Sequence, residues 1–179
     1  MQQKGMVWVI GASGGLGRAA AQAFAQNGWS VIAGARSFAE GTSPLGEGVT
    51  VLPLDVTSEE SCAAFVKKAL GMESRVDVLV CAAAQLVLGS CENTTVDELD
   101  RLLNVNVLGT VRMIQRALPL MRAQKSGKII LFSSINGLLG IPFQSAYTAS
   151  KHALEGYAEC LAMETADFGI QVCLVEPGD

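Results

Sequence analysis

Short apolar runs alternate with longer amphipathic segments along the chain, and this alternation predicts a layered α/β fold. The apolar runs expected to form strands are residues 6–10, 30–33, 49–53, 76–80, 128–132 and 171–175. The segments expected to be helical are residues 15–26, 58–70, 96–124 and 147–167. Continuous apolar strands that alternate with helices form a parallel sheet covered on both faces. We therefore predict a doubly wound, Rossmann-like sheet with strand order 3-2-1-4-5-6.

Residues at the expected helix ends support this division. Ser58, followed by two glutamates, fits the start of a helix, because a serine hydroxyl can cap free backbone N–H groups and acids favour the positive end of the helix dipole. Gly71 and Gly127 follow expected helices, as C-terminal capping glycines do.

The size and composition of the chain fit one domain over residues 1–179, which is long enough to bury a substantial core. Half of the residues are hydrophobic and 17% are charged, which predicts helix faces buried against a sheet or a partner subunit. The net charge of −4 argues against a nucleic-acid partner, since no basic stripe is available to meet phosphates. The first apolar run is too short to span a membrane, and we expect a cytoplasmic protein.

The histidine and cysteine content argues against a metal site. The chain has a single histidine, His152, and its cysteines form no Cys-x-x-Cys pair. The five cysteines are Cys62, Cys81, Cys91, Cys160 and Cys173. Their odd number, in a chain that does not open with a signal-peptide pattern, predicts reduced thiols. We expect Cys81, Cys160 and Cys173 to be inert core residues.

A glycine-rich turn follows the first expected strand. Residues 11–17 read Gly-Ala-Ser-Gly-Gly-Leu-Gly and lead into an alanine-rich helix. Glycines let the backbone approach a pyrophosphate closely, and a helix N-terminus offers free N–H groups and a positive dipole end. The spacing differs from the Gly-x-Gly-x-x-Gly fingerprint, and a turn that needs glycine only for packing is the alternative. Its place directly after the first strand favours dinucleotide binding.

Residues after the second and third strands bear on the choice of nucleotide. Ala35 and Arg36 stand where NAD-selective sites place an acid for the ribose hydroxyls. A guanidinium suits a 2′-phosphate, and Ser13 can add a hydroxyl donor, so we predict NADP(H) rather than NAD(H). An ordinary exposed arginine is the alternative. Asp55 can accept a hydrogen bond from an adenine amino group, although its spacing alone favours capping of the following turn.

Three residues supply candidate proton-transfer chemistry. Tyr147 and Lys151 share one face of the expected helix, and a neighbouring ammonium favours the phenolate of a tyrosine. The pair can therefore move a proton to or from a substrate oxygen, although such pairs are common on surface helices. Ser134 ends the fifth strand, at the edge where open α/β sheets bind ligands, and can hydrogen-bond a substrate carbonyl. Local backbone hydrogen bonding is its alternative role and the expected role of Ser133.

Asn106 stands between two valines inside the longest expected helix. Asparagine is unfavourable in a helix, and an amide flanked by apolar residues is expected to be buried and hydrogen-bonded. A structural hydrogen bond is one interpretation, and a water-mediated link to Lys151 is the other.

Together these positions resemble the short-chain dehydrogenase/reductase family over the whole chain. The matching residues, in order, are Gly11, Gly15, Gly17, Asp55, Asn106, Ser134, Tyr147, Lys151, Pro177 and Gly178. Residues 104–116, 137–143 and 149–156 look closest to the hydroxysteroid and retinol dehydrogenase branch. The resemblance implies an NADP(H)-dependent oxidoreductase that interconverts a carbonyl and an alcohol by hydride transfer. It also implies a homodimer or tetramer.

The resemblance assigns a role to each residue. Tyr147 is implied to be the general acid/base, and Lys151 to favour its phenolate and hold the nicotinamide ribose. Ser134 is implied to orient the substrate and Asn106 to hold a proton-relay water. The residues implied to contact the cofactor are Gly11, Ser13, Gly15, Leu16, Gly17, Arg36, Asp55, Val56, Ala82, Tyr147, Lys151, Pro177 and Gly178.

The chain departs from the family pattern at three places. Ile10 replaces a threonine whose hydroxyl normally ties down the glycine turn. Residues 81–84 read Cys-Ala-Ala-Ala where the family has Asn-Asn-Ala-Gly, so Ala84 adds a methyl group beside the cofactor path. The family continues well past its Pro-Gly pair, whereas this chain stops at Asp179. We therefore expect a truncated form or fragment that lacks the final strand and leaves the sixth strand as a sheet edge.

Two other classes of function compete with an active reductase. The altered residues 81–84 and the end at Asp179 favour a non-catalytic NADP(H)-binding module or an inactive fragment of such an enzyme. A purely structural partner-binding domain is the third hypothesis, and it predicts no nucleotide affinity. The substrate stays open, because the family's substrate-selecting residues lie beyond the position of Asp179.

Overall fold

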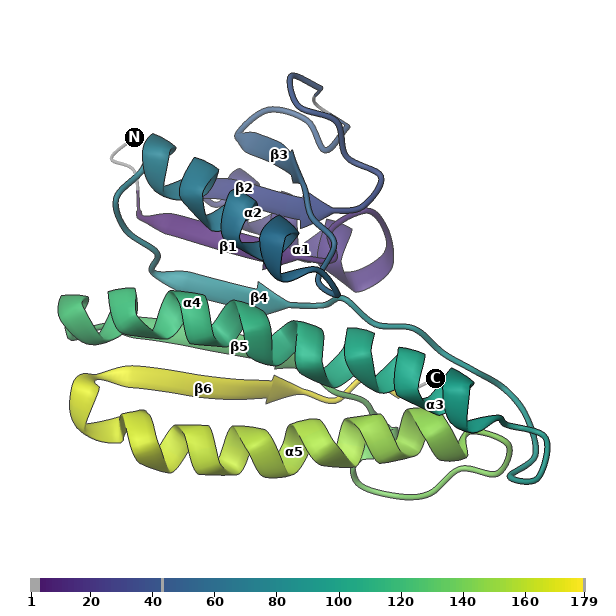
Figure 1. Ribbon diagram of the computed structural model, residues 1–179. Helices are drawn as coiled ribbons and strands as arrows, with labels where there is room; N and C mark the ends of the chain where they lie inside the picture. Colours follow the sequence, from purple (N-terminus) through teal and green to yellow (C-terminus); the bar gives the residue numbers. More distant parts are fainter. Residues whose placement is uncertain (1–3, 43, 179) are drawn as a thin grey trace.

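The computed structural model describes residues 4–42 and 44–178, and these residues form a six-stranded parallel sheet (Figure 1). The strands are β1 (Met6–Ile10), β2 (Ser30–Ala35), β3 (Val49–Pro53), β4 (Val78–Cys81), β5 (Gly127–Phe132) and β6 (Ile170–Val175). Their order is β3-β2-β1-β4-β5-β6, and all five pairings are parallel. The predicted strand order is therefore confirmed.

Helices connect the strands except between β2 and β3, where the described residues form no helix. They are α1 (Gly15–Gln26), α2 (Glu59–Met72), α3 (Val96–Leu103), α4 (Gly109–Gln124) and α5 (Ser145–Thr165). A five-residue π-helical segment, Asn104–Leu108, joins α3 to α4, and short 3-10 turns lie at Ile135–Gly137 and Ala166–Phe168. The single helix expected over residues 96–124 is therefore interrupted, and the interruption contains Asn106. Such π-helical turns are rare and often occur at functional sites.

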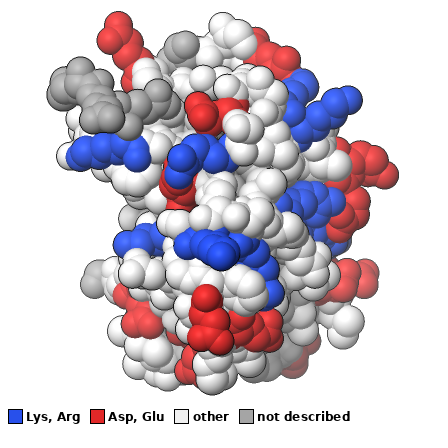
Figure 2. All heavy atoms as spheres, turned by 90° about the vertical axis from the view of Figure 1, so that its left-hand side faces the viewer, with Lys and Arg blue, Asp and Glu red and all other residues white. Residues whose placement is uncertain are grey.

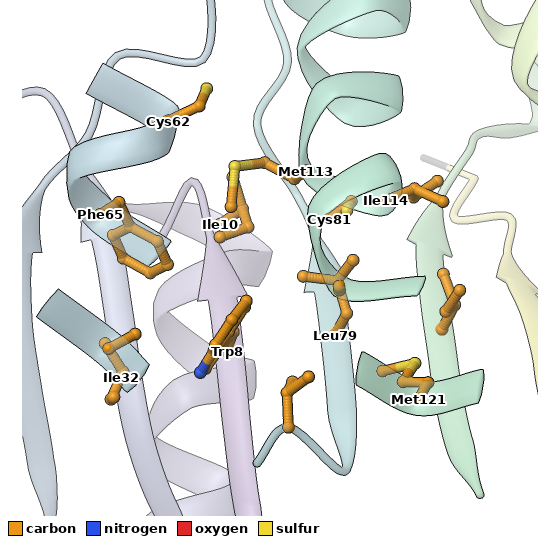
Figure 3. Close-up of a cluster of buried hydrophobic side chains, with 14 of the residues drawn as sticks. Trp8, Ile10, Ile32, Cys62, Phe65, Leu79, Cys81, Met113, Ile114 and Met121 are labelled. Atoms are coloured by element: carbon orange, nitrogen blue, oxygen red, sulfur yellow. The ribbon is translucent and has the colours of Figure 1, made fainter. Parts of the chain in front are cut away.

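The two faces of the sheet carry separate hydrophobic clusters because side chains alternate along each strand. On one face, Trp8 and Phe65 pack edge to face with 6.0 Å between ring centroids, and Met113 of α4 lies nearby (Figure 3). Residues from α2, α4 and α5 all join this cluster. On the other face, Val7 and Val9 pack with residues of α1.

Helices cover the second face of the sheet less evenly than the alternation of strands and helices in the sequence predicted. The helical residues of its hydrophobic cluster all come from α1, which lies over β1, β2 and β3. Ile130 and Cys173 are paired neighbours in β5 and β6 on this face, and both are only partly buried. Within the described residues β6 pairs with β5 alone, so it forms the sheet edge that the sequence predicted.

Two predicted helix caps were wrong and one is confirmed. Gly71 lies inside α2, and Gly127 is the first residue of β5. The left-handed C-cap of α4 is instead Lys125, with φ of 53°. Glycine is only a preference at helix ends, and neighbouring residues can replace it. The Ser58 cap is confirmed, because its Oγ accepts a hydrogen bond from the Ser61 N–H at 3.1 Å.

All five cysteines are free thiols, as predicted, but their environments differ. Cys62 and Cys81 are buried, and burial raises the pKa of both thiols, to about 12 for Cys81. The expectation that Cys160 is a core residue was wrong, because it lies on the solvent face of α5 and is exposed. Cys173 is half-buried on the edge strand.

The surface carries both signs of charge. Figure 2 shows the end of the molecule at the amino termini of the strands, where basic and acidic side chains are interspersed. None of the helices in residues 4–42 and 44–178 is long and apolar enough to cross a membrane.

Candidate functional site

Two pockets lie along the carboxyl edge of the sheet, on the right in Figure 1. The first pocket has a volume of about 260 Å³. It is lined by Gly11, Ser13, Gly14, Ala35, Arg36, Leu54, Asp55, Val56, Ala82, Ala83, Ala84, Gln85 and Val105. Except for Val105 of the π-helical segment, these residues end or follow β1, β2, β3 and β4, which meet at the edge where open α/β sheets bind ligands. Six predicted cofactor residues lie here: Gly11, Ser13, Arg36, Asp55, Val56 and Ala82.

The glycines of the first turn serve different purposes. Gly11 has φ of +87°, and a Cβ there would lie 2.4 Å from the Ala83 backbone nitrogen. A Cβ on Gly17 would lie 2.3 Å from the Gly11 carbonyl oxygen. Chain packing alone therefore requires glycine at these two positions, as the alternative interpretation of the turn holds. Gly14 has nothing within 4 Å of its Cβ position, so packing gives no reason for glycine there.

The start of α1 can receive an anion. Gly14 is the N-cap of α1 and offers no side chain to its free N–H groups, and the first turn contains no acid. By contrast, Ser58 caps α2 and Thr95 forms a capping box at α3. An uncapped helix N-terminus beside a pocket fits a pyrophosphate. The predicted residues Gly15 and Leu16 are exposed in this turn but do not line the first pocket.

Backbone hydrogen bonds hold the glycine turn in a chain that has Ile10 before it. The carbonyl oxygen of Gly34 accepts hydrogen bonds from the N–H groups of Gly11 at 2.9 Å and Ala12 at 3.2 Å. These two bonds tie the glycine turn to the end of β2 without a threonine hydroxyl.

Asp55 caps a turn and lines the first pocket. Its Oδ1 accepts hydrogen bonds from the Thr57 hydroxyl at 2.7 Å and the Thr57 N–H at 2.9 Å. These bonds lower the pKa of Asp55, burial opposes the shift, and the positive charges of Arg36 and Arg112 add to it. Asp55 is therefore ionised at neutral pH, and its charge lies near the exposed Arg36 guanidinium.

The second pocket has a volume of about 180 Å³ and lies between the end of β5 and the start of α5. It is lined by Leu86, Ser134, Ile135, Asn136, Gln144, Tyr147 and Pro177. The structure thus brings Ser134 and Tyr147 into one pocket, with Pro177 beside them. Gly178 is exposed and does not line either pocket.

Asn136 organises the second pocket, and sequence reasoning missed it. Its N–H donates to Ser134 Oγ, and the Ser134 hydroxyl donates to Asn136 Oδ1, both at 3.3 Å. Asn136 Nδ2 donates to Gln144 Oε1 at 3.0 Å and Thr148 Oγ1 at 2.9 Å. The amide thereby ties the turn after β5 to the start of α5. The Ser-x-Asn spacing, which favours local side-chain-to-backbone bonding, was the available signal.

Lys151 is buried beside Tyr147. Its Nζ lies 5.4 Å from the centroid of the Tyr147 ring and donates to the Phe132 carbonyl oxygen at 2.7 Å. Only 2% of the residue is exposed. Burial lowers the pKa of Lys151 to about 8, against the opposing effect of the Glu155 carboxylate.

Asn106 is fully buried, and its side chain is committed to protein partners. Oδ1 accepts from the Gln85 N–H at 2.7 Å, and Nδ2 donates to the Gln85 carbonyl and Ser150 Oγ, both at 3.0 Å. Ser150 in turn donates to the Tyr147 carbonyl oxygen at 2.7 Å. Both amide hydrogens of Asn106 are used, so its side chain supports the structural interpretation and has no donor left for a relay water.

The part of the chain that the structure describes contains no cluster of metal-binding side chains. No three His, Cys, Asp or Glu side chains come together there in a way that could hold a metal ion. His152 is exposed on α5, and its Nδ1 lies 3.1 Å from the Thr148 carbonyl oxygen.

Comparison with known proteins identifies relatives over nearly the whole chain. A family model described as short chain dehydrogenase matches residues 5–179. A 3-ketodihydrosphingosine reductase from Bacteroides thetaiotaomicron is 40% identical over 177 residues, covering 99% of this chain and 64% of the relative. The 17-beta-hydroxysteroid dehydrogenase type 1 of Homo sapiens is 45% identical over 127 residues, covering 71% of this chain and 38% of the relative. The chain thus spans less than two thirds of the length of these relatives.

Solved structures share the fold. A short-chain dehydrogenase from Streptomyces avermitilis matches with a TM-score of 0.90 and 38% identity, over 97% of this chain and 66% of the other. The structure of ElxO with NADP bound matches with a TM-score of 0.90 and 31% identity, over 99% of this chain and 74% of the other.

Proposed function

This chain belongs to the short-chain dehydrogenase family, and we propose that it binds NADP(H) and interconverts a carbonyl and an alcohol, with Tyr147 as general acid/base. The observation that carries the proposal is the convergence of Ser134 and Tyr147 on one pocket, with Lys151 Nζ 5.4 Å from the Tyr147 ring. A binding module has no evident need for this set of residues beside a nucleotide pocket.

The first pocket fits a dinucleotide by the chemistry of its residues. The uncapped start of α1 would hold the pyrophosphate, and Arg36 would pair with a 2′-phosphate. The ionised Asp55 would accept a hydrogen bond from the adenine amino group. The relative with NADP bound supports a nicotinamide cofactor, and the exposed guanidinium of Arg36 supports the phosphorylated form. When bound, the cofactor supplies or accepts the hydride.

The second pocket would handle the substrate oxygen. In the reductive direction Tyr147 donates its phenolic proton to that oxygen, and in the oxidative direction the phenolate takes the proton back. The Lys151 ammonium beside the ring favours the phenolate. Ser134 orients the carbonyl by turning its hydroxyl from Asn136 Oδ1 to the substrate oxygen.

The substrate is proposed to be a hydrophobic ketone or alcohol. Leu86 and Ile135 line the second pocket, and both are exposed at its rim. The pocket also presents polar side chains, which suits a ligand that carries a polar oxygen on an apolar body. The relatives named for ketosphingosine and hydroxysteroid substrates support this class.

A non-catalytic NADP(H)-binding module is the second candidate. Ala84 lines the first pocket and adds a methyl group to its wall, which favours altered cofactor placement. Both candidates bind nucleotide, and they differ in turnover.

The test has two stages. NADPH and NADH are titrated calorimetrically into the wild type, Arg36→Ala and the matched control Arg75→Ala, whose side chain is exposed outside both pockets. We expect wild type and control to prefer NADPH and Arg36→Ala to lose about 1.5–3 kcal/mol of NADPH binding. NADPH oxidation is then followed with a panel of ketones and aldehydes. Equal affinities in the wild type refute the NADP(H) preference, and binding without turnover favours the non-catalytic module.

A further inference from the structure

Lys151 carries a charge that its immediate contacts do not balance. Its hydrogen-bond acceptor is the neutral carbonyl of Phe132, and the residue is 2% exposed. An ammonium removed from water is costly unless an opposite charge compensates it. A buried lysine with only neutral partners therefore needs an anion close by.

Glu155 has a buried carboxylate oxygen that likewise lacks a compensating partner in the described part of the chain. Its Oε1 is buried and has no hydrogen-bond partner among the described residues. The side chain lies one helical turn after Lys151 on the same face of α5, in the series Tyr147, Lys151 and Glu155. A buried carboxylate oxygen is as costly as a buried ammonium, and each can compensate the other.

The turn after β5 leaves room for the Glu155 carboxylate. A Cβ on Gly137 would lie 2.6 Å from Glu155 Oε1 and 2.6 Å from Ser133 Oγ, so both atoms gather over the bare Cα of Gly137. Ser133 Oγ is also buried and has no partner among the described residues, so the local backbone hydrogen bond expected of Ser133 was wrong. Lys151 and Glu155 thus both reach from α5 to the end of β5, at Phe132 and at Gly137 respectively.

The other titratable groups around Lys151 do not supply the charge. Tyr147 presents the face of its ring to Lys151 from the same helix. Cys81 at the end of β4 is a thiol whose burial raises its pKa to about 12, so it stays protonated. The turn after β5 presents Ser133, Ser134 and Asn136, which are neutral, and Glu159 on α5 is exposed. Glu155 is the carboxylate that raises the pKa of Lys151 against its burial.

We propose that Glu155 is a positioning residue that acts through Lys151, because its carboxylate keeps the buried Lys151 side chain in the ammonium form beside Tyr147. The catalytic consequence rests on the proposed function, since only a proton transfer at Tyr147 makes the Lys151 charge useful. The charge relationship itself can be measured without turnover.

The test follows the titration of Lys151 by NMR in the full chain labelled with ¹³C-lysine. The Lys151 signal is identified by its loss in Lys151→Arg. We compare the pH midpoint of this signal in wild type, Glu155→Gln and the matched control Glu159→Gln. Loss of the Glu155 charge is expected to reduce the proton affinity of Lys151 on the order of tenfold, so the midpoint moves to lower pH. The control midpoint is expected to stay in place.

An unchanged midpoint in Glu155→Gln, or an equal shift in Glu159→Gln, overturns the proposal. If circular dichroism shows that Glu155→Gln does not fold, the same pH titration is made on Gly137→Ala. The Cβ that this substitution adds would displace the Glu155 carboxylate and should also lower the pH midpoint of the Lys151 signal. An unchanged midpoint in Gly137→Ala then overturns the proposal. A shifted midpoint in a chain that never turns over supports the Glu155 role and refutes only the proposed oxidoreductase activity.

Discussion

Asn106 and Gln85 hold one another through two hydrogen bonds, one from the Gln85 N–H at 2.7 Å and one to the Gln85 carbonyl at 3.0 Å. Gln85 lines the first pocket, and Asn106 lies in the π-helical segment before α4. The remaining amide hydrogen of Asn106 reaches Ser150, which bonds the carbonyl of Tyr147. One buried amide therefore fixes the wall of the nucleotide pocket relative to the helix that carries Tyr147.

Asn106→Ala should destabilise the fold strongly. The substitution leaves the Gln85 N–H and carbonyl without partners, and each buried polar group left unpaired costs about 1–3 kcal/mol. We expect a loss of about 2–4 kcal/mol in the free energy of unfolding, measured with urea. The control is Asn93→Ala, at an exposed asparagine that bonds only Ser90. A loss of stability no larger than that of Asn93→Ala would contradict the structural role of the Asn106 amide.

Gly11→Ala and Gly14→Ala should separate folding from nucleotide binding. Gly11 combines φ of +87° with a Cβ position 2.4 Å from backbone, so alanine there should prevent or severely weaken folding. Gly14 has extended dihedrals and open space, so alanine should leave the melting temperature nearly unchanged. Gly14→Ala should weaken NADPH binding if the pyrophosphate lies over the start of α1. Unchanged NADPH affinity in a folded Gly14→Ala chain contradicts that placement.

The strand order and the bounds of β1 and β3 could be predicted from the sequence, but the bounds of β4 could not. Val76 is fully buried and was assigned to the fourth strand, yet β4 begins at Val78. The backbone of Val76 bonds the Gln124 side chain instead, with its N–H at 3.2 Å from Oε1 and its carbonyl at 2.8 Å from Nε2. The hydrophobic pattern indicates which residues are buried, but it does not indicate which groups hydrogen-bond to their backbone.

Candidate site residues could be proposed from the sequence where the chemistry would be carried by one side chain, as for Tyr147 and Lys151. Asn136, Gln144 and Ser150 were missed because their importance comes from partners brought close by folding. Ser150 meets Asn106 across 44 positions of sequence, and neither residue reveals the other by spacing. The proposed chemistry was thus accessible from the sequence, whereas the hydrogen bonds that hold it in place required the structure.

The stability of the chain should depend on pH through Lys151. Its pKa is about 8 in the folded chain against an ordinary value of 10.5. Between these values the unfolded chain binds more protons, so this group raises the free energy of unfolding as pH rises from about 8 to 10.5. The buried thiols of Cys62 and Cys81 act in the opposite direction at alkaline pH, because their pKa is raised by burial.

Lys151→Met isolates the lysine contribution, since both chains retain the thiols. The unfolding free energy of Lys151→Met minus that of the wild type should fall by at most about 3 kcal/mol as the pH rises from 8 to 10.5. Urea unfolding at several pH values measures it. A difference independent of pH would show that Lys151 keeps its ordinary pKa in the folded chain.

The homodimer implied by the sequence remains a prediction, and we place its interface on the outer faces of α4 and α5. Ile114, Leu154 and Leu161 on these helices are buried in the core, whereas Met163 on α5 is 74% exposed. Leu108, at the end of the π-helical segment before α4, is 49% exposed. Helices that are apolar beyond one stripe need burial on two sides. We expect light scattering to give a dimer and Met163→Lys to weaken it. A monomer at high protein concentration contradicts the prediction.

Tyr147→Phe tests the proposed mechanism most directly. The substitution keeps the ring over which Lys151 lies and removes only the phenolic proton, so the fold and NADPH affinity should persist. The Tyr147 backbone carbonyl, which the variant retains, accepts the hydrogen bond from the Ser150 hydroxyl. If a C-terminally extended form reduces a carbonyl, turnover should fall roughly 10²–10⁴-fold, the usual contribution of general acid/base catalysis. Ser134→Ala should lower turnover while leaving NADPH affinity intact, because Ser134 lines the second pocket and not the first. Ser133→Ala is the matched control, since that buried hydroxyl has no partner among the described residues. Turnover of Tyr147→Phe at the wild-type rate, with circular dichroism and NADPH affinity unchanged, would exclude Tyr147 as the proton donor.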